Sequence, residues 1–276
     1  MENSIMEDND VLLLKEAKQK MQDISWAMKG LNLAASTVSF TTDTVKNQAK
    51  NWLSKKYQVK VDKVINKVEL SVEKALHKLI KANLKTIKTK KKFKKPSKKT
   101  YKLLTTTSGA VSGFFGSTTG FGTLIFTSEF TLTTKFMLRS IMDIARSHGE
   151  DLYNLETQKA CFEVFALGGE SKSDDDLDIA YYSSRVALNQ GLDKVTAEGL
   201  KKLVGYISKR LSVVITEKFL AQALPLVGAI GGGTINLAFI SHYQKMAEAH
   251  FTIRSLERKY GKTIVESTYT TILINQ

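Results

Sequence analysis

The most regular pattern in the chain is an apolar stripe over residues 59–87. Val61, Val64, Val68 and Val72 recur at three- or four-residue spacing, and lysines occupy positions between them. This period predicts an amphipathic helix with one basic face, which we place over residues 58–87. Such a helix could lie on a membrane surface or bind a partner, or its basic face could simply be solvated.

Two later stretches, residues 103–128 and 219–241, contain no charged residue. Each is punctuated by glycines and continues into an amphipathic helix. Small residues four positions apart share one helix face and allow a second backbone to approach closely. We therefore predict that the two stretches pack together. The glycines expected at this contact are Gly109, Gly113, Gly116, Gly120, Gly228 and Gly232.

Local end signals complete the prediction. Asp8–Asp10 could cap a first helix over residues 11–28, and Asn154 could cap a helix over 155–167. Gly261, after two arginines and a lysine, predicts the end of the last long helix. The residues beyond Gly261 are expected to pack as a strand or turn.

Only two prolines occur, which favours long helices over a fold of many strands. We predict an all-α fold: a single helical domain built around the two glycine-rich apolar segments, with a basic amphipathic N-terminal helical region. The expected divisions are an N-terminal helical extension (1–57), the basic helix (58–87), a lysine-rich linker (88–102), the helical core (103–262) and a C-terminal tail (263–276).

The net charge of the chain indicates which class of partner it attracts. Lysine and arginine outnumber aspartate and glutamate by 41 to 27, a net charge of +14. Such an excess attracts anionic lipid or nucleic acid. The densest cluster surrounds Pro96, and we expect it to be an exposed linker because like charges repel and proline interrupts helices. Its lysines are Lys88, Lys90, Lys91, Lys92, Lys94, Lys95, Lys98, Lys99 and Lys102.

This lysine tract favours an anionic membrane surface over nucleic acid. It lacks the arginines and interleaved aromatic residues typical of specific nucleic-acid readers. A solvated linker without a partner is the competing interpretation. The acidic N-terminus does not resemble a secretory signal, so we expect a location in the cytoplasm or on the cytoplasmic side of a membrane.

Polar residues also form stripes on the two later helices. Glu129 and Asp143 fall on one helix face, and His250 and Arg254 on one face of another. If these faces meet, the carboxylates could pair with the histidine and arginine. The group is a candidate acid–base site, for example of a lipid-directed hydrolase, or an ion-pair network that fixes helix register. We favour the network.

No cofactor or metal is expected, because histidine spacings typical of metal sites are absent. Cys161 lies within an apolar helical pattern, so we expect it to pack in the core rather than act as a nucleophile.

Several segments together resemble one known family, the EcsC protein family. They are residues 133–146, 149–152, 162–169, 225–236 and 249–261. The resemblance implies an α-helical domain of bacterial type associated with membranes, and it implies no established reaction. Our hypothesis from the sequence is a peripheral or partly inserted helical protein that binds anionic lipid. The alternatives are the hydrolase and a nucleic-acid or protein-binding module that uses the lysine tract.

Overall fold

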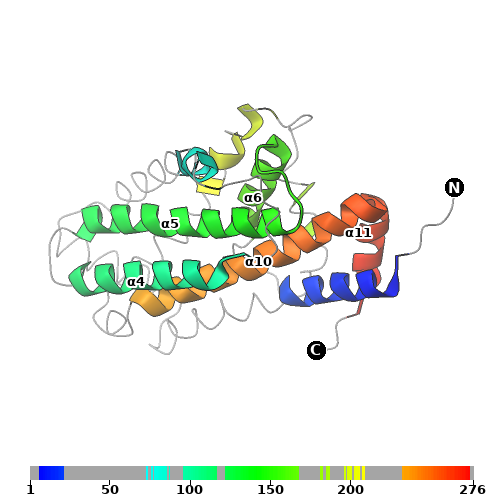
Figure 1. The fold of residues 1–276 in the computed structure, drawn as a ribbon, viewed down its shortest axis with the longest axis horizontal. Helices are drawn as coiled ribbons and strands as arrows, with labels where there is room; N and C mark the ends of the chain where they lie inside the picture. Colours follow the sequence, from blue (N-terminus) through cyan, green and yellow to red (C-terminus); the bar gives the residue numbers. More distant parts are fainter. Residues whose placement is uncertain are drawn as a thin grey trace, which may run out of the picture.

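The computed structural model describes a helical protein (Figure 1). The described residues are 6–21, 73, 76, 78–85, 87, 96–116, 122–167, 181–182, 185–186, 196, 198–200, 202–205, 207–208 and 232–273. Within them all regular structure is helical, which confirms the all-α prediction. The labelled helices are α4 (Lys98–Gly116), α5 (Gly122–Ser147), α6 (Leu155–Leu167), α10 (Gly232–Tyr260) and α11 (Lys262–Thr271).

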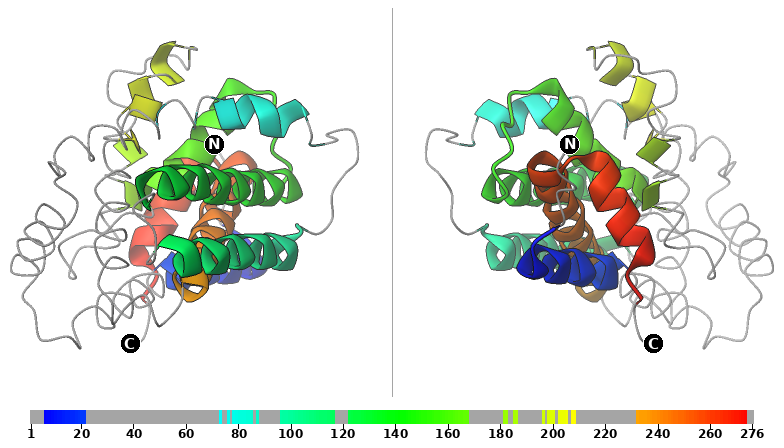
Figure 2. Two further views of the ribbon diagram at one scale, coloured as in Figure 1. Left: turned by 90° about the vertical axis from the view of Figure 1, so that its left-hand side faces the viewer. Right: turned by 90° about the vertical axis from the view of Figure 1, so that its right-hand side faces the viewer.

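Three long helices form the body of the fold. Helices α4 and α5 run side by side in opposite directions, and α10 packs against both (Figures 1 and 2). The described parts of the two glycine-bearing segments, residues 103–116, 122–128 and 232–241, therefore belong to neighbouring helices. Gly120 and Gly228 lie outside the described residues, as do the side chains around the other predicted packing glycines, so the role of these glycines stays a prediction.

Helix α4 begins earlier than the sequence suggested. Lys98, Lys99 and Lys102 belong to its first turns rather than to a linker. Proline cannot continue a helix but tolerates one that starts just after it, and Pro96 lies two residues before the helix. Charge repulsion is offset here because Lys98 pairs with Glu248 of α10. The other six lysines of the tract lie outside the described residues.

The main core lies where α5, α6 and α10 meet. Leu138, Phe162 and Phe251 are completely buried there. Leu79 and Ile80 join this core from the helical residues 78–85, while the lysines on the same segment are exposed. Within the part of the chain that the structure describes, this segment confirms the predicted basic amphipathic helix.

The two ends of the chain pack together in a second cluster. Leu14 of the N-terminal helix (residues 8–21) is buried against α10 and α11 together with Val265 and Tyr269. The buried Lys18 ammonium donates hydrogen bonds to the carbonyls of Tyr269 (2.9 Å) and Ile272 (2.7 Å). Residues 262–271 are thus helical, and the expected strand or turn was wrong. The contact with Lys18 supports a helix that the local sequence of this short segment did not indicate.

Two predicted helix ends are confirmed. The Asn154 side chain accepts a hydrogen bond from the backbone N–H of Glu156 at 2.9 Å, at the start of α6. Gly261 follows the last residue of α10 with φ of 88°, a conformation that favours glycine. Asp10, expected as a cap, instead lies inside the first helix and bonds Lys259 and Tyr260 of α10.

Candidate functional site

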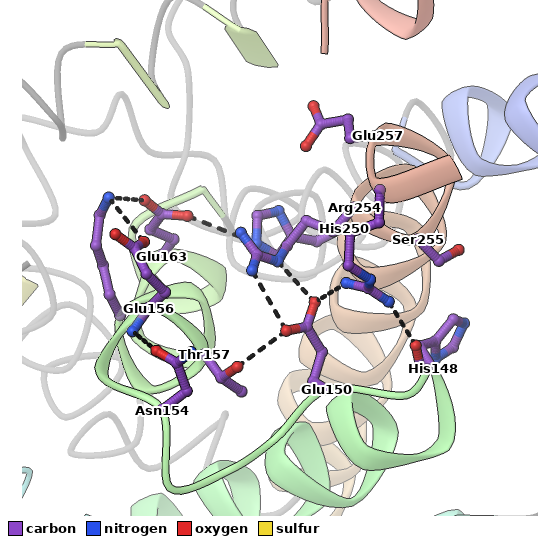
Figure 3. A network of polar contacts seen from close by, with 12 residues as sticks. His148, Glu150, Asn154, Glu156, Thr157, Glu163, His250, Arg254, Ser255 and Glu257 are labelled. Carbon is purple, nitrogen blue, oxygen red and sulfur yellow. Dashed lines mark hydrogen bonds and ion pairs between the residues drawn. The ribbon is translucent and has the colours of Figure 1, made fainter. Parts of the chain in front are cut away.

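A polar network forms where the C-terminal half of α10 faces α6 (Figure 3). His250, Arg254 and Glu257 are spaced by four and three residues, so they project from one face of α10. The turn after α5 supplies both His148 and Glu150. Charged and polar side chains from these two parts of the chain therefore meet in a region otherwise surrounded by core residues.

Glu150 is the anionic centre of the network. Its carboxylate accepts hydrogen bonds from Arg254 Nε at 2.9 Å and Nη2 at 3.3 Å, and from Thr157 Oγ1 at 2.9 Å. Arg258 also pairs with it and donates to the carbonyl of His148 at 2.7 Å. Burial raises the pKa of Glu150, but the bonds and charges of Arg254 and Arg258 outweigh burial, so its pKa lies below the ordinary value. Glu150 is therefore ionised at neutral pH.

His250 is completely buried and neutral. Its Nδ1 lies 2.9 Å from the Tyr181 hydroxyl, and its Nε2 lies 3.6 Å from Glu163 Oε2. Burial lowers the pKa of His250 well below 6.5, and the nearby positive charges of Arg185, Arg254 and Lys159 lower it further. The contact with Glu163 is consequently not an ion pair.

Each remaining charge of the network also has a partner. Arg185 makes a bidentate contact with Glu257, at 2.6 and 3.0 Å. Lys159 lies 3.7 Å from Glu163. The Arg185 guanidinium also lies over the Tyr181 ring, 5.4 Å from its centroid. Paired, hydrogen-bonded charges of this kind tie three segments of the chain together.

The predicted meeting of Asp143 with His250 and Arg254 was wrong. Asp143 accepts hydrogen bonds from the Tyr101 hydroxyl and from Arg146 Nη2, each at 2.8 Å, so it joins α4 to α5. Burial and the charge of Asp143 raise the pKa of Tyr101 to about 12, which keeps the phenol a hydrogen-bond donor. Glu129 lies in α5, but its side chain is outside the described residues.

Cys161 does not provide a nucleophile. It is buried in the main core, and burial raises the pKa of its thiol. A nucleophilic cysteine requires the thiolate, which a lowered pKa favours. This agrees with the packing role that the sequence suggested.

The carboxylates that face His250 and Arg254 are Glu163 and Glu150, which sequence patterns did not single out. Helical spacing shows which residues share a face, but it does not show which residue on another helix stands opposite. The sequence offers only a general indication of these partners, because a buried arginine needs an anionic group beside it. Within the described residues no group of three potential metal ligands is present. The geometry is that of a network of paired charges between α10 and its neighbouring segments, and its role in fixing helix register stays a prediction.

The profile of the EcsC protein family matches residues 16–256. The chain belongs to the EcsC protein family. No significant match is found among curated proteins or solved structures. The EcsC match begins within the N-terminal helix and stops before α11, so the contact between Lys18 and the end of α11 joins a family segment to a tail outside the match.

The neutral, buried His250 predicts a pH dependence of stability. Below pH 6.5 the unfolded chain binds a proton at this histidine that the native state does not bind. The free energy of unfolding should therefore fall as pH decreases from about 6.5 to 5, by up to about 1.4 kcal/mol per pH unit from this residue. Urea unfolding at several pH values measures this change in the free energy of unfolding.

His250→Gln should flatten this pH dependence, even though it also removes packing and lowers stability at every pH. His148→Gln, which alters a partly exposed imidazole, is the matched control and should retain the slope. An unchanged slope in His250→Gln would show that other groups govern acid stability.

Proposed function

We propose that this EcsC-family protein is a membrane-associated helical protein that binds anionic lipid through its lysine tract. The supporting observation is the exposed start of α4, which continues the tract. Lys99 is exposed, and Leu103 and Leu104 follow one turn later with 65% and 38% of their surface accessible. Cationic and apolar side chains thus occur together at one surface site, the combination that interfacial helices use.

The energetics favour a lipid surface over a solvated linker. Each lysine near an anionic surface contributes about 1 kcal/mol, so nine lysines could supply ample binding energy even if several remain in solution. Lys98 should contribute least, because Glu248 already neutralises it. Exposed leucines add an apolar contribution that salt does not screen.

The polar network on α10 gives no comparable support to a hydrolase. Glu150 is held ionised by two arginines, and His250 is completely buried. General acid–base catalysis needs a group that exchanges protons with a substrate within reach. The observed pairing instead accounts for these residues as a source of stability.

Flotation with liposomes tests the proposal. The purified chain should float with vesicles that contain anionic phospholipid, and much less with neutral vesicles or at high salt. The double variant Lys99→Gln, Lys102→Gln should weaken binding by about 2 kcal/mol, or roughly thirtyfold. Replacing all nine lysines by glutamine should remove most of the salt-sensitive component.

The matched control is Lys15→Gln with Lys262→Gln, which removes the same charge from exposed positions on the terminal helices. If this pair weakens flotation as much as the α4 pair, net charge rather than the tract governs binding. If neither the wild type nor any variant floats, and the wild type binds oligonucleotides with strong salt dependence, the tract is a nucleic-acid-binding element.

A further inference from the structure

Three helix ends almost free of charge gather at one end of the molecule. Residues 103–116 of α4, 122–134 of α5 and 232–244 of α10 contain no aspartate, glutamate, lysine or arginine except Glu129, and their one histidine, His242, is buried. In Figure 1 the end of α4 and the starts of α5 and α10 lie together on the left, far from α11 and the network of Figure 3. We call these three stretches the tip.

Lysines border the tip on all three helices at a similar distance. Lys102 lies 14 residues from Gly116, Lys135 lies 13 from Gly122, and Lys245 lies 13 from Gly232. At 1.5 Å per residue, each separation is about 20 Å along its helix. Lys245 is exposed, and the other two are partly exposed. The positive charge thus forms a belt around the base of the tip.

Exposed leucines lie on the tip side of this lysine belt. Leu103 is 65% accessible, Leu132 of α5 is 40% accessible and Leu237 of α10 is 39% accessible. Three neighbouring helices therefore each expose a large apolar side chain between the lysine belt and the helix end. Scattered exposed leucines are ordinary in soluble proteins, but here all three lie next to the lysine belt, on its uncharged side.

We propose that the tip enters one leaflet of an anionic membrane, with the lysine belt at the level of the headgroups. This inference rests on the proposed lipid binding and adds its orientation. A hydrocarbon core is about 30 Å thick, so one leaflet is about 15 Å deep, and lysines about 20 Å from the helix ends reach the headgroup region. None of the described helices is both long and apolar enough to cross a membrane, whereas a shallow insertion needs no complete span.

Glu129 is the exception within the tip. It lies seven residues from Gly122, about 10 Å along α5. Acidic residues at membrane depth are tolerated when they face protein rather than lipid. The tip consists of three packed helices, so an inward-facing position for such a residue is available among them.

Depth-dependent quenching tests the orientation. The variants Leu132→Cys, Leu237→Cys and Tyr153→Cys are labelled with an environment-sensitive fluorophore. The native Cys161 is buried, and the wild type treated in parallel gives the background. On anionic vesicles the two tip probes should shift to shorter wavelength and be quenched by nitroxides on the acyl chains. Tyr153, 58% accessible in the turn before α6, is the control and should stay water-exposed.

The outcomes separate this inference from the proposed function. Salt-sensitive flotation with tip probes that remain accessible to aqueous iodide would overturn the insertion and leave lipid binding intact. Tip probes shielded before vesicles are added would overturn it in favour of a second copy of the chain covering the tip. Insertion into neutral vesicles at high salt would support the tip and refute the role of the lysine tract. Absence of flotation under all conditions would overturn both.

Discussion

Replacing Glu150 by glutamine should lower the free energy of unfolding by about 3 kcal/mol, the largest effect we expect from a single polar substitution. Glu150 is the shared partner of Arg254 and Arg258, and an amide cannot neutralise them. Arg254 would be left largely buried without its counter-charge, the situation that makes broken buried ion pairs costly. Arg258 is 44% exposed and should add little.

For a chain of this length, 3 kcal/mol corresponds to a fall in melting temperature of about 5 °C, measurable by circular dichroism. Glu156→Gln is the control, because its carboxylate is 55% exposed and 3.8 Å from Lys159. It should change stability by less than about 0.5 kcal/mol. Equal melting temperatures for the two variants would show that the Glu150 network is not a source of stability.

Glu150 also predicts an acid limit. Its pKa in the native state lies below the ordinary 4.5, so its contribution to stability is present above that value and is lost as pH falls further. The loss occurs at lower pH than that expected from His250. A Glu150→Gln variant should therefore lose part of the wild-type pH dependence below about pH 4.5 only.

Asp143→Ala should have the second largest effect, again about 3 kcal/mol. Asp143 is buried between α4 and α5, and its loss removes an acceptor from the buried Tyr101 hydroxyl and an anion from Arg146, whose side chain is 10% exposed. A buried donor without an acceptor costs about 1–3 kcal/mol, and a buried charge that loses a counter-charge adds to this cost. Chemical denaturation measures the change.

Asp143→Asn should recover part of this stability, because its amide oxygen still accepts a hydrogen bond from Tyr101. Asp8→Ala, at an exposed position on the N-terminal helix, is the control for removing an acidic charge. The prediction fails if Asp143→Ala is as stable as the control. In that case the contact of Asp143 with Tyr101 would not be needed for stability, and Asp143 would be a candidate for a role other than stability.

Local patterns predicted the helices well where the pattern itself determines the structure. The apolar stripe before the lysine tract is buried at Leu79 and Ile80, as its period required. Asn154 caps α6 and Gly261 follows α10, because capping and left-handed backbone conformations depend on one or two residues. Helix type and helix ends are local properties, so a single sequence contains them.

Long-range pairing was predicted less well. Helical spacing grouped His250 with Arg254 and Glu129 with Asp143, but it could not state which groups would face each other. Glu163 and Glu150 face the first pair, while Asp143 faces Tyr101. Helices α5, α6 and α10 meet at angles and depths set by the packing of side chains such as Phe162 and Phe251. A shift of one turn would change every partner.

By itself, the sequence determined an all-helical chain, a basic tract and two charge-free glycine-bearing stretches, because composition and period follow directly from residue order. Only the tertiary structure decided that three such helix ends gather into one tip bordered by Lys102, Lys135 and Lys245. It also decided that the tail forms α11, held by Lys18 from the other end of the chain. These features depend on contacts between residues distant in sequence, and packing rather than local preference selects them.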